Sequence, residues 1–465
     1  MFNNPLTKLT ERTQELMTQT GVPGVAVGVR HQGTEYVATL GITNRNHPLP
    51  VDENTLFQIG SISKTMTATV AMRLVEQGRL DLDAPVRRYL PDFRLQDEAA
   101  AANASVRHLF THTGGWLGDY FADTGKGDDA LARYVANMVQ LPQLAPLGTV
   151  WSYNNAAFSL AGRVIEVVAG QPFEQVMQEL LFVPLGMNMS FYFTGDIMTQ
   201  RFVAGHIMAD FTSREHKSDY DIEVATPWPL ARSAHAAGGV IATVRDMLRY
   251  ARLHLDRGTA ADGARLLGAD SIAAMQSQQS TAADYAEVMG ISWMLGKTDW
   301  VRTISHGGAT NGQIAQLVLA PDHDFALVIL TNANRGRELT RDLSNWALQS
   351  FLGAMATPPT LRTLTPEALQ PYLGYYTARL TDVEVTAGDG GLVLQSIPKG
   401  GFPDKDSPAG PTPPPAPSVF FEEDRFIITD GPSKEGRGEF IRDQHGTIRW
   451  VRVGGRIHER TKRQG

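Results

Sequence analysis

The chain of 465 residues contains no cysteine. Disulfide bonds, zinc sites with thiolate ligands and cysteine nucleophiles are therefore excluded. The absence is equally compatible with a cytosolic and with an exported protein, so it leaves the compartment open.

Long apolar runs and an excess of positive charge are also missing. No stretch approaches the ~18 uninterrupted apolar residues of a membrane-spanning helix, so we expect no transmembrane segment. The net charge of −7 at pH 7 disfavours a nucleic-acid partner, which needs a basic face. Residues 1–21 have apolar side chains at helical spacing among polar ones, which predicts an amphipathic surface helix rather than a signal peptide. We therefore expect a cytoplasmic protein, although a trimmed exported form would have the same appearance.

The chain contains 42% hydrophobic and 20% charged residues, which is typical of a globular protein. Its length suggests two or three domains. Residues 24–43 predict two strands around a turn. Helical patterns dominate from Ser61 to about Leu185. Strand patterns return at Trp300–Ile304, Gln313–Leu319 and Phe325–Thr331, and a helix follows at Leu339–Phe351. Strands on both sides of a helical middle predict an α+β fold, with one antiparallel sheet and the helices packed beside it.

The composition changes near residues 353–369, where threonine and proline are frequent and periodicity is lost, which indicates a linker. Six short alternating runs follow, separated by turn residues: DVEVTA, GLVLQS, SVFFEE, RFIITD, GEFIRD and TIRWVRV. This pattern predicts a small β-barrel or sandwich of about 100 residues. A proline- and glycine-rich loop at 398–418 interrupts it, and we expect this loop to be mobile.

The stretch FQIGSISKTMTATVAMRL, residues 57–74, places Ser61 and Lys64 three residues apart at the start of an apolar helix. Residues three apart lie one above the other on a helix. A lysine among apolar neighbours loses its charge readily and can accept a proton, and a serine needs such a base to become a nucleophile. Alone, the pattern is equally explained by a capping serine and a lysine that extends to solvent.

Two further stretches contain polar residues suited to chemistry. In GTVWSYNNAAFSLAG, residues 148–162, Tyr153 and Asn155 stand at the head of an apolar helical run. In TISHGGATNGQ, residues 303–313, His306 and two glycines interrupt a strand pattern. Glycine within a strand often marks the close approach of a ligand or another backbone. Each stretch alone has an ordinary structural explanation, but the order of all three along the chain is very hard to obtain by chance.

These three stretches resemble the motifs of the serine β-lactamase and penicillin-binding protein superfamily. The matches to its first, second and third motifs are Ser61-Ile62-Ser63-Lys64, Tyr153-Asn154-Asn155 and His306-Gly307-Gly308. The most similar branch is that of class C β-lactamases, D-specific peptidases and carboxylesterases of the S12 peptidase type. Further stretches are similar to the framework of this branch: GRLDLDAPVRRYLP (78–91), VRHLFTHTGG (106–115), AAGGVIATVRDMLRYARLHL (236–255) and VILTNAN (328–334).

The resemblance covers roughly residues 5–352 and implies a domain organisation. Residues 1–353 are expected to form a catalytic domain of the β-lactamase/DD-peptidase-like fold, with a helical subdomain at about 80–200. A linker is expected at 354–368. Residues 369–465 are expected to form a lipocalin-like β-barrel, because some peptidases of this branch have such a C-terminal domain.

The resemblance also implies roles for the site residues. Ser61 is expected to attack a carbonyl and form an acyl-enzyme, with either Lys64 or Tyr153 as the base. Asn155 is expected to orient Lys64 and bind the acyl side of the substrate. The backbone N–H groups of Ser61 and Ala309 are expected to form the oxyanion hole. The remaining members of the catalytic and substrate-binding set are His306, Gly307, Gly308 and Asn311.

One residue departs from the pattern of the branch. Its β-lactamases generally have lysine at the start of the third motif, where this chain has His306. Histidine there resembles the D-peptidases, so efficient β-lactam hydrolysis is not expected. The strand that begins at His306 could pair with an extended substrate backbone.

We therefore expect a serine hydrolase that acts on peptide, amide or ester substrates, including substrates with D-configured residues. Three alternatives stay open: a penicillin-binding-protein-type thioesterase or peptide cyclase, a weak β-lactamase, and a catalytically silent protein whose barrel binds an apolar ligand. The expected partner is a small-molecule or peptide substrate, and an oligomer stays open. Loops such as 116–130 and 205–235 are expected to form the pocket walls.

No metal or organic cofactor is needed for this chemistry. His108 and His112 are four residues apart, which imitates a zinc pair on a helix. No glutamate lies between them and the stretch belongs to the family-like framework, so we expect no metal site. The glycine-rich run at 21–28 precedes a strand rather than a helix, so a phosphate-binding loop is not expected either.

Overall fold

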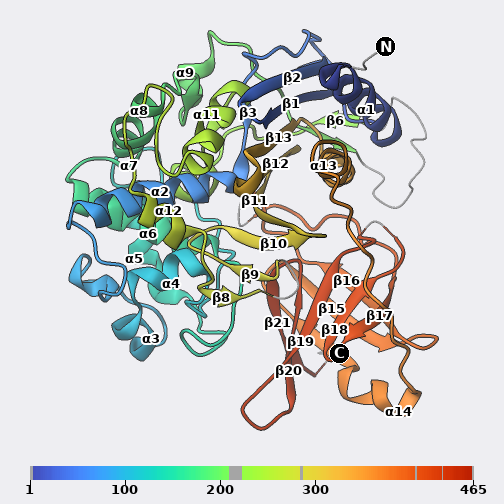
Figure 1. The fold of residues 1–465 in the computed structure, drawn as a ribbon. Coiled ribbons are helices and arrows are strands. Elements are labelled where there is room, and N and C mark those ends of the chain that lie inside the picture. Colours follow the sequence, from blue (N-terminus) through green and yellow to red (C-terminus); the bar gives the residue numbers. More distant parts are fainter. Residues whose placement is uncertain (1–3, 209–221, 283–285, 404–405, 432, 463–465) are drawn as a thin grey trace.

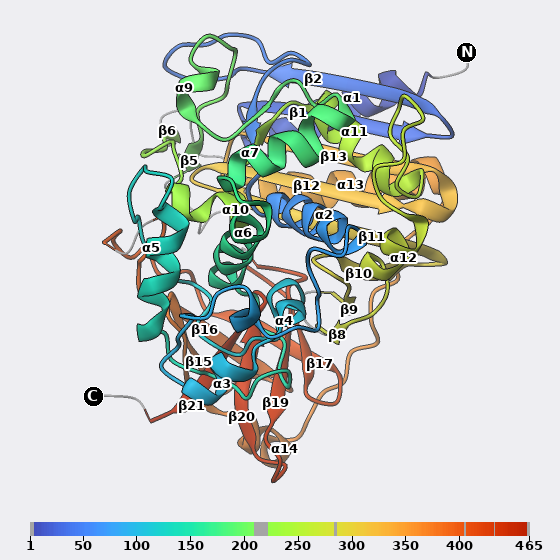
Figure 2. The ribbon, with the colours of Figure 1, turned by 90° about the vertical axis from the view of Figure 1, so that its left-hand side faces the viewer.

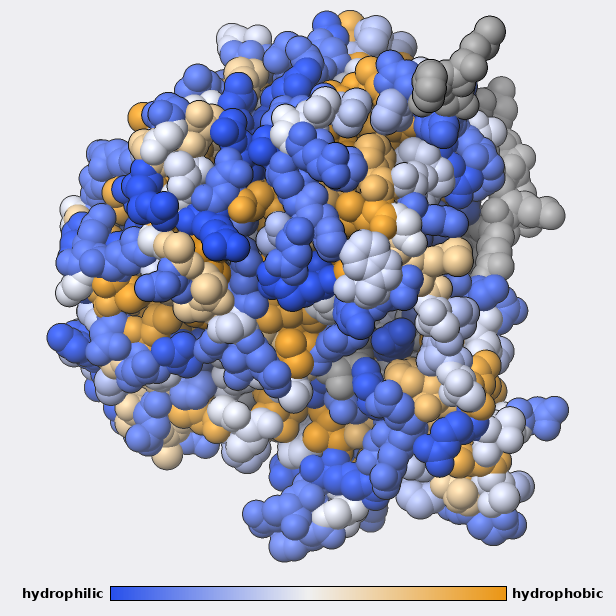
Figure 3. Space-filling view, viewed as in Figure 1, coloured by the Kyte–Doolittle hydropathy of each residue, from blue (hydrophilic) through white to orange (hydrophobic). Residues whose placement is uncertain are grey.

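The structure, a computed structural model, describes residues 4–208, 222–282, 286–403, 406–431 and 433–462. Figure 1 shows an α+β part that runs from blue to gold and a β-barrel in orange and red below it. The face in Figure 3 is polar over most of its area, with apolar side chains in small patches. No helix in these ranges is long and apolar enough to cross a membrane.

One eight-stranded antiparallel sheet forms the centre of the α+β part. Its order is β2 (Thr34–Gly41), β1 (Gly24–His31), β13 (Phe325–Thr331), β12 (Gln313–Ala320), β11 (Val301–Thr310), β10 (Met294–Thr298), β9 (Val288–Met289) and β8 (Ser280–Thr281). The prediction of a single antiparallel sheet with strands from both sides of the helical middle is confirmed. The sequence pattern did not reveal β8, β9 and β10, because they are too short to alternate visibly.

Helices cover both faces of this sheet. The longer helices are α1 (Pro5–Thr20), α2 (Ser63–Glu76), α6 (Asn155–Ala169), α11 (Val244–Leu255) and α13 (Gly336–Leu352). The shorter ones are α3 (Glu98–Asn103), α4 (Val106–Thr111), α5 (Ala130–Asn137), α7 (Phe173–Met177), α8 (Val183–Leu185), α9 (Thr194–Ile197), α10 (His235–Gly238) and α12 (Ala269–Met275). Two small sheets join them, β3 (Phe57–Gln58)–β7 (Ile241–Ala242)–β4 (Ser190–Phe191) and β5 (His206–Met208)–β6 (Ile222–Val224). Figure 2 shows the helical region in front of the sheet.

Strand β1 illustrates why the sheet is covered on both sides. Successive side chains of a strand point to opposite faces. Val25, Val27 and Val29 are fully buried in the cluster that contains α1 and α13. Ala26 belongs to the other core cluster, and a side chain at Gly28 would meet α11. A strand buried on both faces has a continuous apolar sequence, as here.

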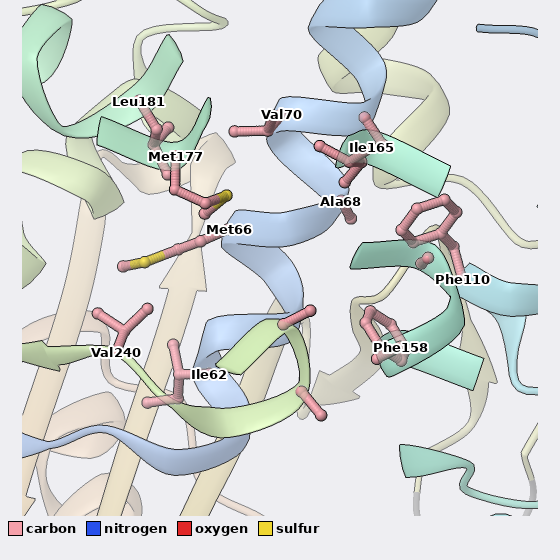
Figure 4. Close-up of a cluster of buried hydrophobic side chains, with 14 of the residues drawn as sticks. Ile62, Met66, Ala68, Val70, Phe110, Phe158, Ile165, Met177, Leu181 and Val240 are labelled. Atoms are coloured by element: carbon pink, nitrogen blue, oxygen red, sulfur yellow. The ribbon is translucent and has the colours of Figure 1, made fainter. Parts of the chain in front are cut away.

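Helix α2 lies in the middle of the larger core. Ile62, Met66 and Val70 are fully buried there, and Phe158 of α6 packs on another side of the same helix (Figure 4). Burial of each such side chain stabilises the fold by roughly 1.5–3 kcal/mol. This packing fixes α2 and the residues at its start, which include the first sequence motif.

The C-terminal part is a closed eight-stranded antiparallel barrel, as the alternating runs predicted. Its strands are β14 (Gly374–Thr377), β15 (Thr381–Ala387), β16 (Leu392–Pro398), β17 (Ala416–Glu422), β18 (Arg425–Ile428), β19 (Arg437–Arg442), β20 (Ile448–Val453) and β21 (Arg456–Thr461). The pattern predicted six of them. It missed β14, which has four residues, and β21, whose sequence RIHERT is strongly charged. These two strands pair with each other and close the barrel.

Side chains fill the interior of the barrel, as expected for eight strands. Phe420, Phe426 and Phe440 meet there, with ring centroids 5.4–6.5 Å apart. The segment before the barrel, predicted as a linker at 354–368, contacts it through the N–H of Arg362, which donates to the carbonyl of Phe420 at 2.7 Å. A short helix, α14 (Pro366–Leu369), begins inside this segment.

Candidate active site

Ser61 lies in a tight turn between β3 and α2. Gly60 has a φ of 52° and opens a 3₁₀ turn at Gly60–Ile62 that leads directly into the helix. A residue other than glycine would be strained at this φ. Its Cβ would also lie 2.6 Å from the amide nitrogen of Ala309 on β11. Gly60 therefore allows the serine turn and the third motif to lie side by side.

Lys64 is completely buried one turn after the serine. Its Nζ lies 3.1 Å from Ser61 Oγ, 2.8 Å from Asn155 Oδ1 and 2.6 Å from the carbonyl oxygen of Ala237. Burial lowers the pKa of Lys64 well below its ordinary value, and the positive charge of Arg456 lowers it further.

The partners of Lys64 suit both forms of the amine, since an ammonium can donate to all three oxygens. A neutral amine has two N–H groups and one lone pair. The oxygens of Asn155 and Ala237 only accept, so they take the two N–H groups. In the neutral form the lone pair is left for Ser61, whose hydroxyl can then donate to Nζ across the same 3.1 Å. In this state Lys64 is placed to accept the proton of Ser61.

Tyr153 and Asn155 come from the start of α6. The side chain of Asn154 caps this helix by accepting from the N–H of Ala157 at 2.8 Å. The buried ring of Tyr153 lies 4.9 Å from Lys64 Nζ and stacks on the ring of His112 at 4.5 Å. The second motif thus meets the first at Lys64.

His112 is held in one tautomer by the backbone next to Tyr153. Its Nδ1 accepts from the N–H of Asn154 at 3.0 Å, so the proton of a neutral ring is on Nε2. Burial, followed by the charge of Lys64, lowers the pKa of His112 well below its ordinary value. The neutral ring therefore supports the ring of Tyr153.

His306 lies on β11 with its side chain fully buried. Its ring centroid is 6.2 Å from that of Tyr153. Burial lowers the pKa of His306 to about 3, and the charge of Lys64 acts in the same direction. The imidazole is therefore neutral at physiological pH. Its Nε2 is buried without a hydrogen-bond partner among the described residues.

Gly308 brings β11 against the serine turn. A Cβ at position 308 would overlap the carbonyl oxygen of Ile59 and lie 3.1 Å from the amide nitrogen of Ser61. The predicted oxyanion-hole donors, the N–H groups of Ser61 and Ala309, are consequently on neighbouring segments. Strand β10 pairs with β11 only as far as Ser305, so it leaves residues 306–310 without a β10 partner.

Gly307 and Asn311 differ in their relation to the site. Gly307 lines the cavity above Ser61. Asn311 lies in the turn between β11 and β12 and does not line this cavity. Its Nδ2 donates to the carbonyl oxygen of Pro227 at 3.2 Å, and Pro227 is a lining residue.

The barrel contributes an arginine to the site that the sequence analysis missed. The guanidinium of Arg456 contacts Asp119 with N–O distances of 3.1 and 3.3 Å. Asp119 Oδ1 also accepts from Asn155 Nδ2 at 2.8 Å, and Asn155 in turn contacts Lys64. The N–H of Tyr153 donates to the carbonyl of Gly455 at 2.8 Å. Nothing in the spacing of Asp119 and Arg456, which are 337 residues apart, indicates this contact.

A cavity of about 1000 Å³ lies over Ser61. Parts of both predicted wall loops line it, including Tyr120–Asp123 and Pro229–Ala234, while residues 209–221 of the second loop lie outside the described residues. Phe402 and Pro403, from the loop predicted to be mobile, also line it. Phe402 meets Phe121 with ring centroids 5.1 Å apart. The cavity is therefore enclosed by both the α+β part and the barrel.

The histidine pair that imitates a zinc site is arranged differently. His108 Nδ1 accepts from the N–H of Ser105 at 3.0 Å and caps the start of α4. His112 instead contacts Asn154 and Tyr153. No group of three or more histidine, aspartate and glutamate residues suited to a metal ion occurs in the described parts of the chain.

Comparison with known proteins was made for both sequence and structure. The sequence model of the family described as Beta-lactamase matches residues 9–351. Penicillin-binding protein 4 of Amycolatopsis lactamdurans is 34% identical over 350 residues, which are 74% of this chain and 89% of that protein.

Two solved structures of SurE are similar to nearly the whole chain. SurE has 26% identity and a TM-score of 0.75, and SurE with D-Leu has 25% identity and a TM-score of 0.74; each match covers 98% of this chain and 99% of that chain. The octameric penicillin-binding protein homologue from Pyrococcus abyssi has the same fold, with 20% identity, a TM-score of 0.66 and coverage of 98% and 99%. The chain belongs to the β-lactamase family of serine hydrolases, the superfamily that its three motifs resemble.

Proposed function

We propose that this protein is a serine hydrolase that forms an acyl-enzyme through Ser61 on peptide, amide or ester substrates. The observation that supports this most directly is the contact between Ser61 Oγ and Nζ of the buried Lys64 at 3.1 Å. A serine hydroxyl becomes a nucleophile when a nearby base takes its proton. Burial lowers the pKa of Lys64, which favours the neutral amine that can act as such a base.

In the proposed acylation, Ser61 Oγ bonds to the substrate carbonyl carbon while its proton passes to Lys64 Nζ. The negative charge moves to the carbonyl oxygen, which the N–H groups of Ser61 and Ala309 stabilise. Such preorganised donors are worth about 3–4 kcal/mol each. The bond to the leaving group then breaks as that group takes the proton. Tyr153, whose ring lies 4.9 Å from Lys64 Nζ, is the alternative base or the relay to the leaving group.

Deacylation of the acyl-enzyme by water then completes the hydrolysis. Water attacks the acyl carbonyl, its proton passes to Lys64, and Ser61 leaves as the free hydroxyl. Asn155 is proposed to hold Lys64 in place, because its Oδ1 accepts from Nζ and its Nδ2 is fixed by Asp119. His306, Gly307 and Gly308 are proposed to line the acyl-binding edge, and Asn311 to support Pro227 in the cavity wall.

A peptide with a D-configured residue is the proposed acyl donor. The cavity of about 1000 Å³ is large enough for several residues. The similarity to SurE with D-Leu extends over 98% of this chain, including the barrel residues that line the cavity. This similarity supports D-leucine or a similar apolar D-residue next to the scissile carbonyl.

A second candidate is transfer of the acyl group to an amine, as in a peptide cyclase. The observation that favours it is the apolar cover of the cavity, where Phe402 of the barrel meets Phe121. An apolar cover limits water and leaves room for the amino end of a folded peptide. A weak β-lactamase activity is less well supported, because His306 is neutral where β-lactamases of this branch have a charged lysine.

The catalytically silent alternative is also less well supported. It requires an apolar ligand inside the barrel, where Phe420, Phe426 and Phe440 already meet. It also gives no reason to bury a lysine against a serine, since an unneeded buried amine destabilises the fold.

The test uses peptidyl p-nitrophenyl esters that end in D-Leu or L-Leu, with and without an added amine such as D-alanine amide. Product masses distinguish the free acid from the amide. The proposal predicts turnover of at least one ester, a preference for D-Leu, and its loss in Ser61→Ala. Amide as the main product at millimolar amine would favour transfer over hydrolysis. Turnover that persists in Ser61→Ala would overturn the proposal.

A further inference from the structure

The cavity above Ser61 extends well beyond the catalytic residues, and we call this extension the distal arm. Its floor is formed by side chains of β11 and β12, and its walls by α13 and the barrel. The residues that define it are Thr303, Gln316, Val318, Leu380, Arg337 and Arg437. In Figure 1, α13 lies above the barrel and the strands β10–β12 lie beside both.

Helix α13 presents one continuous stripe to the distal arm. The residues of α13 that line the cavity are Arg337, Thr340, Arg341, Ser344, Asn345 and Leu348. Their spacing of three, one, three, one and three residues keeps them on one face of a helix. Both arginines of the stripe lie in its first half and its last residue is apolar, so the charge is concentrated towards the start of the helix.

Positive charge in the distal arm is only partly compensated. Arg341 lies 2.8 Å from Asp342 and 3.7 Å from Glu435, which also ties α13 to the barrel. Arg337 and Arg437 have no ion pair with any described residue. Among the described residues that line the cavity, Asp123 is the only one with a carboxylate, and it belongs to the wall loop 116–130. In a chain of net charge −7, this makes the distal arm a local site of attraction for anions.

One end of an extended substrate that pairs with β11 would face this arm. A substrate backbone can pair with residues 306–310 of β11, where β10 is absent. At Ser305 that edge is already taken by Met294 of β10. A chain that extends past Ser305 has to leave this edge, and the cavity-lining residues next to it are Ser305 and Thr303; we assign this end to the acyl chain. This path ends in the distal arm.

We propose that the distal arm binds an anionic group, a carboxylate or a phosphate, on the acyl chain several residues from the scissile carbonyl, and that Arg337 and Arg437 hold it. This inference rests on the proposed acyl-enzyme function and narrows its substrates to acyl chains with a remote negative charge. Guanidinium groups bind carboxylates and phosphates through paired charge-assisted hydrogen bonds.

The test compares peptidyl p-nitrophenyl esters of one to six residues whose amino end is capped with succinyl or with acetyl. The two series differ by one remote carboxylate. The inference predicts that, from a certain length onward, kcat/KM of the succinyl ester exceeds that of the acetyl ester by about tenfold at low ionic strength. This ratio should fall to about one in R337Q/R437Q. A terminal acetyl-phosphoserine in place of succinyl distinguishes phosphate from carboxylate.

The matched control is Arg302→Gln, which removes an exposed arginine of β11 that pairs with Asp322 and does not line the cavity. This variant should keep the higher kcat/KM for the succinyl ester over the acetyl ester. A wild-type protein without such a preference at any length, or a preference that persists in R337Q/R437Q, would overturn the inference.

Failure of the proposed function gives a different result, because neither ester series is then turned over. In that case titration calorimetry of Ser61→Ala with succinyl- and acetyl-capped hexapeptide amides decides about the distal arm. Tighter binding of the succinyl peptide by about tenfold, lost on adding R337Q/R437Q, supports it. Equal binding of the two peptides overturns it.

Discussion

The guanidinium carbon of Arg456 lies 4.7 Å from the centre of the Tyr153 ring, so the last strand of the barrel contacts the centre of the candidate active site. The same side chain pairs with Asp119, which accepts a hydrogen bond from Asn155. Asn155 in turn contacts Lys64. The barrel is therefore connected to the proposed base through a continuous set of polar contacts, and changes in the barrel are expected to alter catalysis.

Replacement of Arg456 by Gln should move the pH dependence of acylation to higher pH. Burial lowers the pKa of Lys64 most, the charge of Arg456 lowers it further, and Asp119 raises it. Because the neutral amine is the proposed base, the rate rises as pH rises through this pKa. Loss of the Arg456 charge raises the pKa and shifts the rising limb upward. The measurement is kcat/KM for p-nitrophenyl acetate between pH 5 and 10.

Two variants check this shift. Asp119→Asn should move the limb in the opposite direction, because a negative charge near Lys64 is lost. Arg449→Gln removes a half-exposed arginine of the barrel whose ion pair is with Glu459, and it should leave the limb where it is. An unchanged limb in Arg456→Gln would show that the barrel does not tune the pKa of Lys64.

Lys64→Ala and Tyr153→Phe should each reduce kcat by ~10³-fold or more, because both act in one proton transfer. The double variant should be little worse than either single variant, since residues that act as a unit are strongly non-additive. Single-turnover rates of acylation measure this. Losses that multiply in the double variant would indicate independent roles.

His306→Gln should keep a substantial part of the activity and the same rising pH limb. Burial lowers the pKa of His306 to about 3, so the ring is neutral throughout the working pH range and acts without a charge. The measurement is the pH profile of kcat/KM for His306→Gln and His306→Lys. A His306→Gln protein without acylation, beside a fully active His306→Lys protein, would show that a positive charge is needed here.

Gly308→Ala should reduce acylation by about 10²–10³-fold, the effect of losing one oxyanion-hole donor. The new Cβ would collide with the carbonyl oxygen of Ile59 and push β11 away from Ser61. Gly296→Ala on β10 is the control, because its Cβ has only Thr303 Oγ1 nearby, at 3.7 Å. Thermal unfolding must show both variants folded. Full activity in Gly308→Ala would show that acylation does not require the close approach of β11 to Ser61.

The sequence predicted the parts of the fold that have long regular patterns. β12 and β13 were predicted to within a residue of their bounds, because each is a largely apolar run of seven or eight residues bounded by turns. β8 and β9 have two residues each, too few for a visible pattern; β9 pairs with β10, and β8 pairs with β9. The charged strand β21 is stabilised by its pairing with β14 and β20 rather than by its own pattern.

The candidate site likewise contains residues that the sequence predicted and residues that it did not. Ser61 and Lys64 are three residues apart, so local helix geometry was enough to bring them together. Tyr153, Asn155 and His306 were identified only through family motifs. Arg456 approaches Asp119 through the docking of the barrel on the α+β part, and no local pattern reports such a long-range contact. The sequence indicated His112 only as a possible zinc-site partner of His108. In the structure its partners are Tyr153 and Asn154.

The central claim is that Ser61 is the nucleophile, and covalent labelling by a fluorophosphonate tests it most directly. Ser63→Ala is the matched control: Ser63 is buried, donates to the carbonyl of Gly60 at 2.7 Å and accepts from the N–H of Val240 at 3.1 Å. Its loss should cost about 1–3 kcal/mol of stability but leave labelling intact. The mass of the intact wild-type protein and of Ser63→Ala should increase by one phosphonyl group, and that of Ser61→Ala should not change. A Ser61→Ala protein that gains the same mass at the same rate would contradict the account.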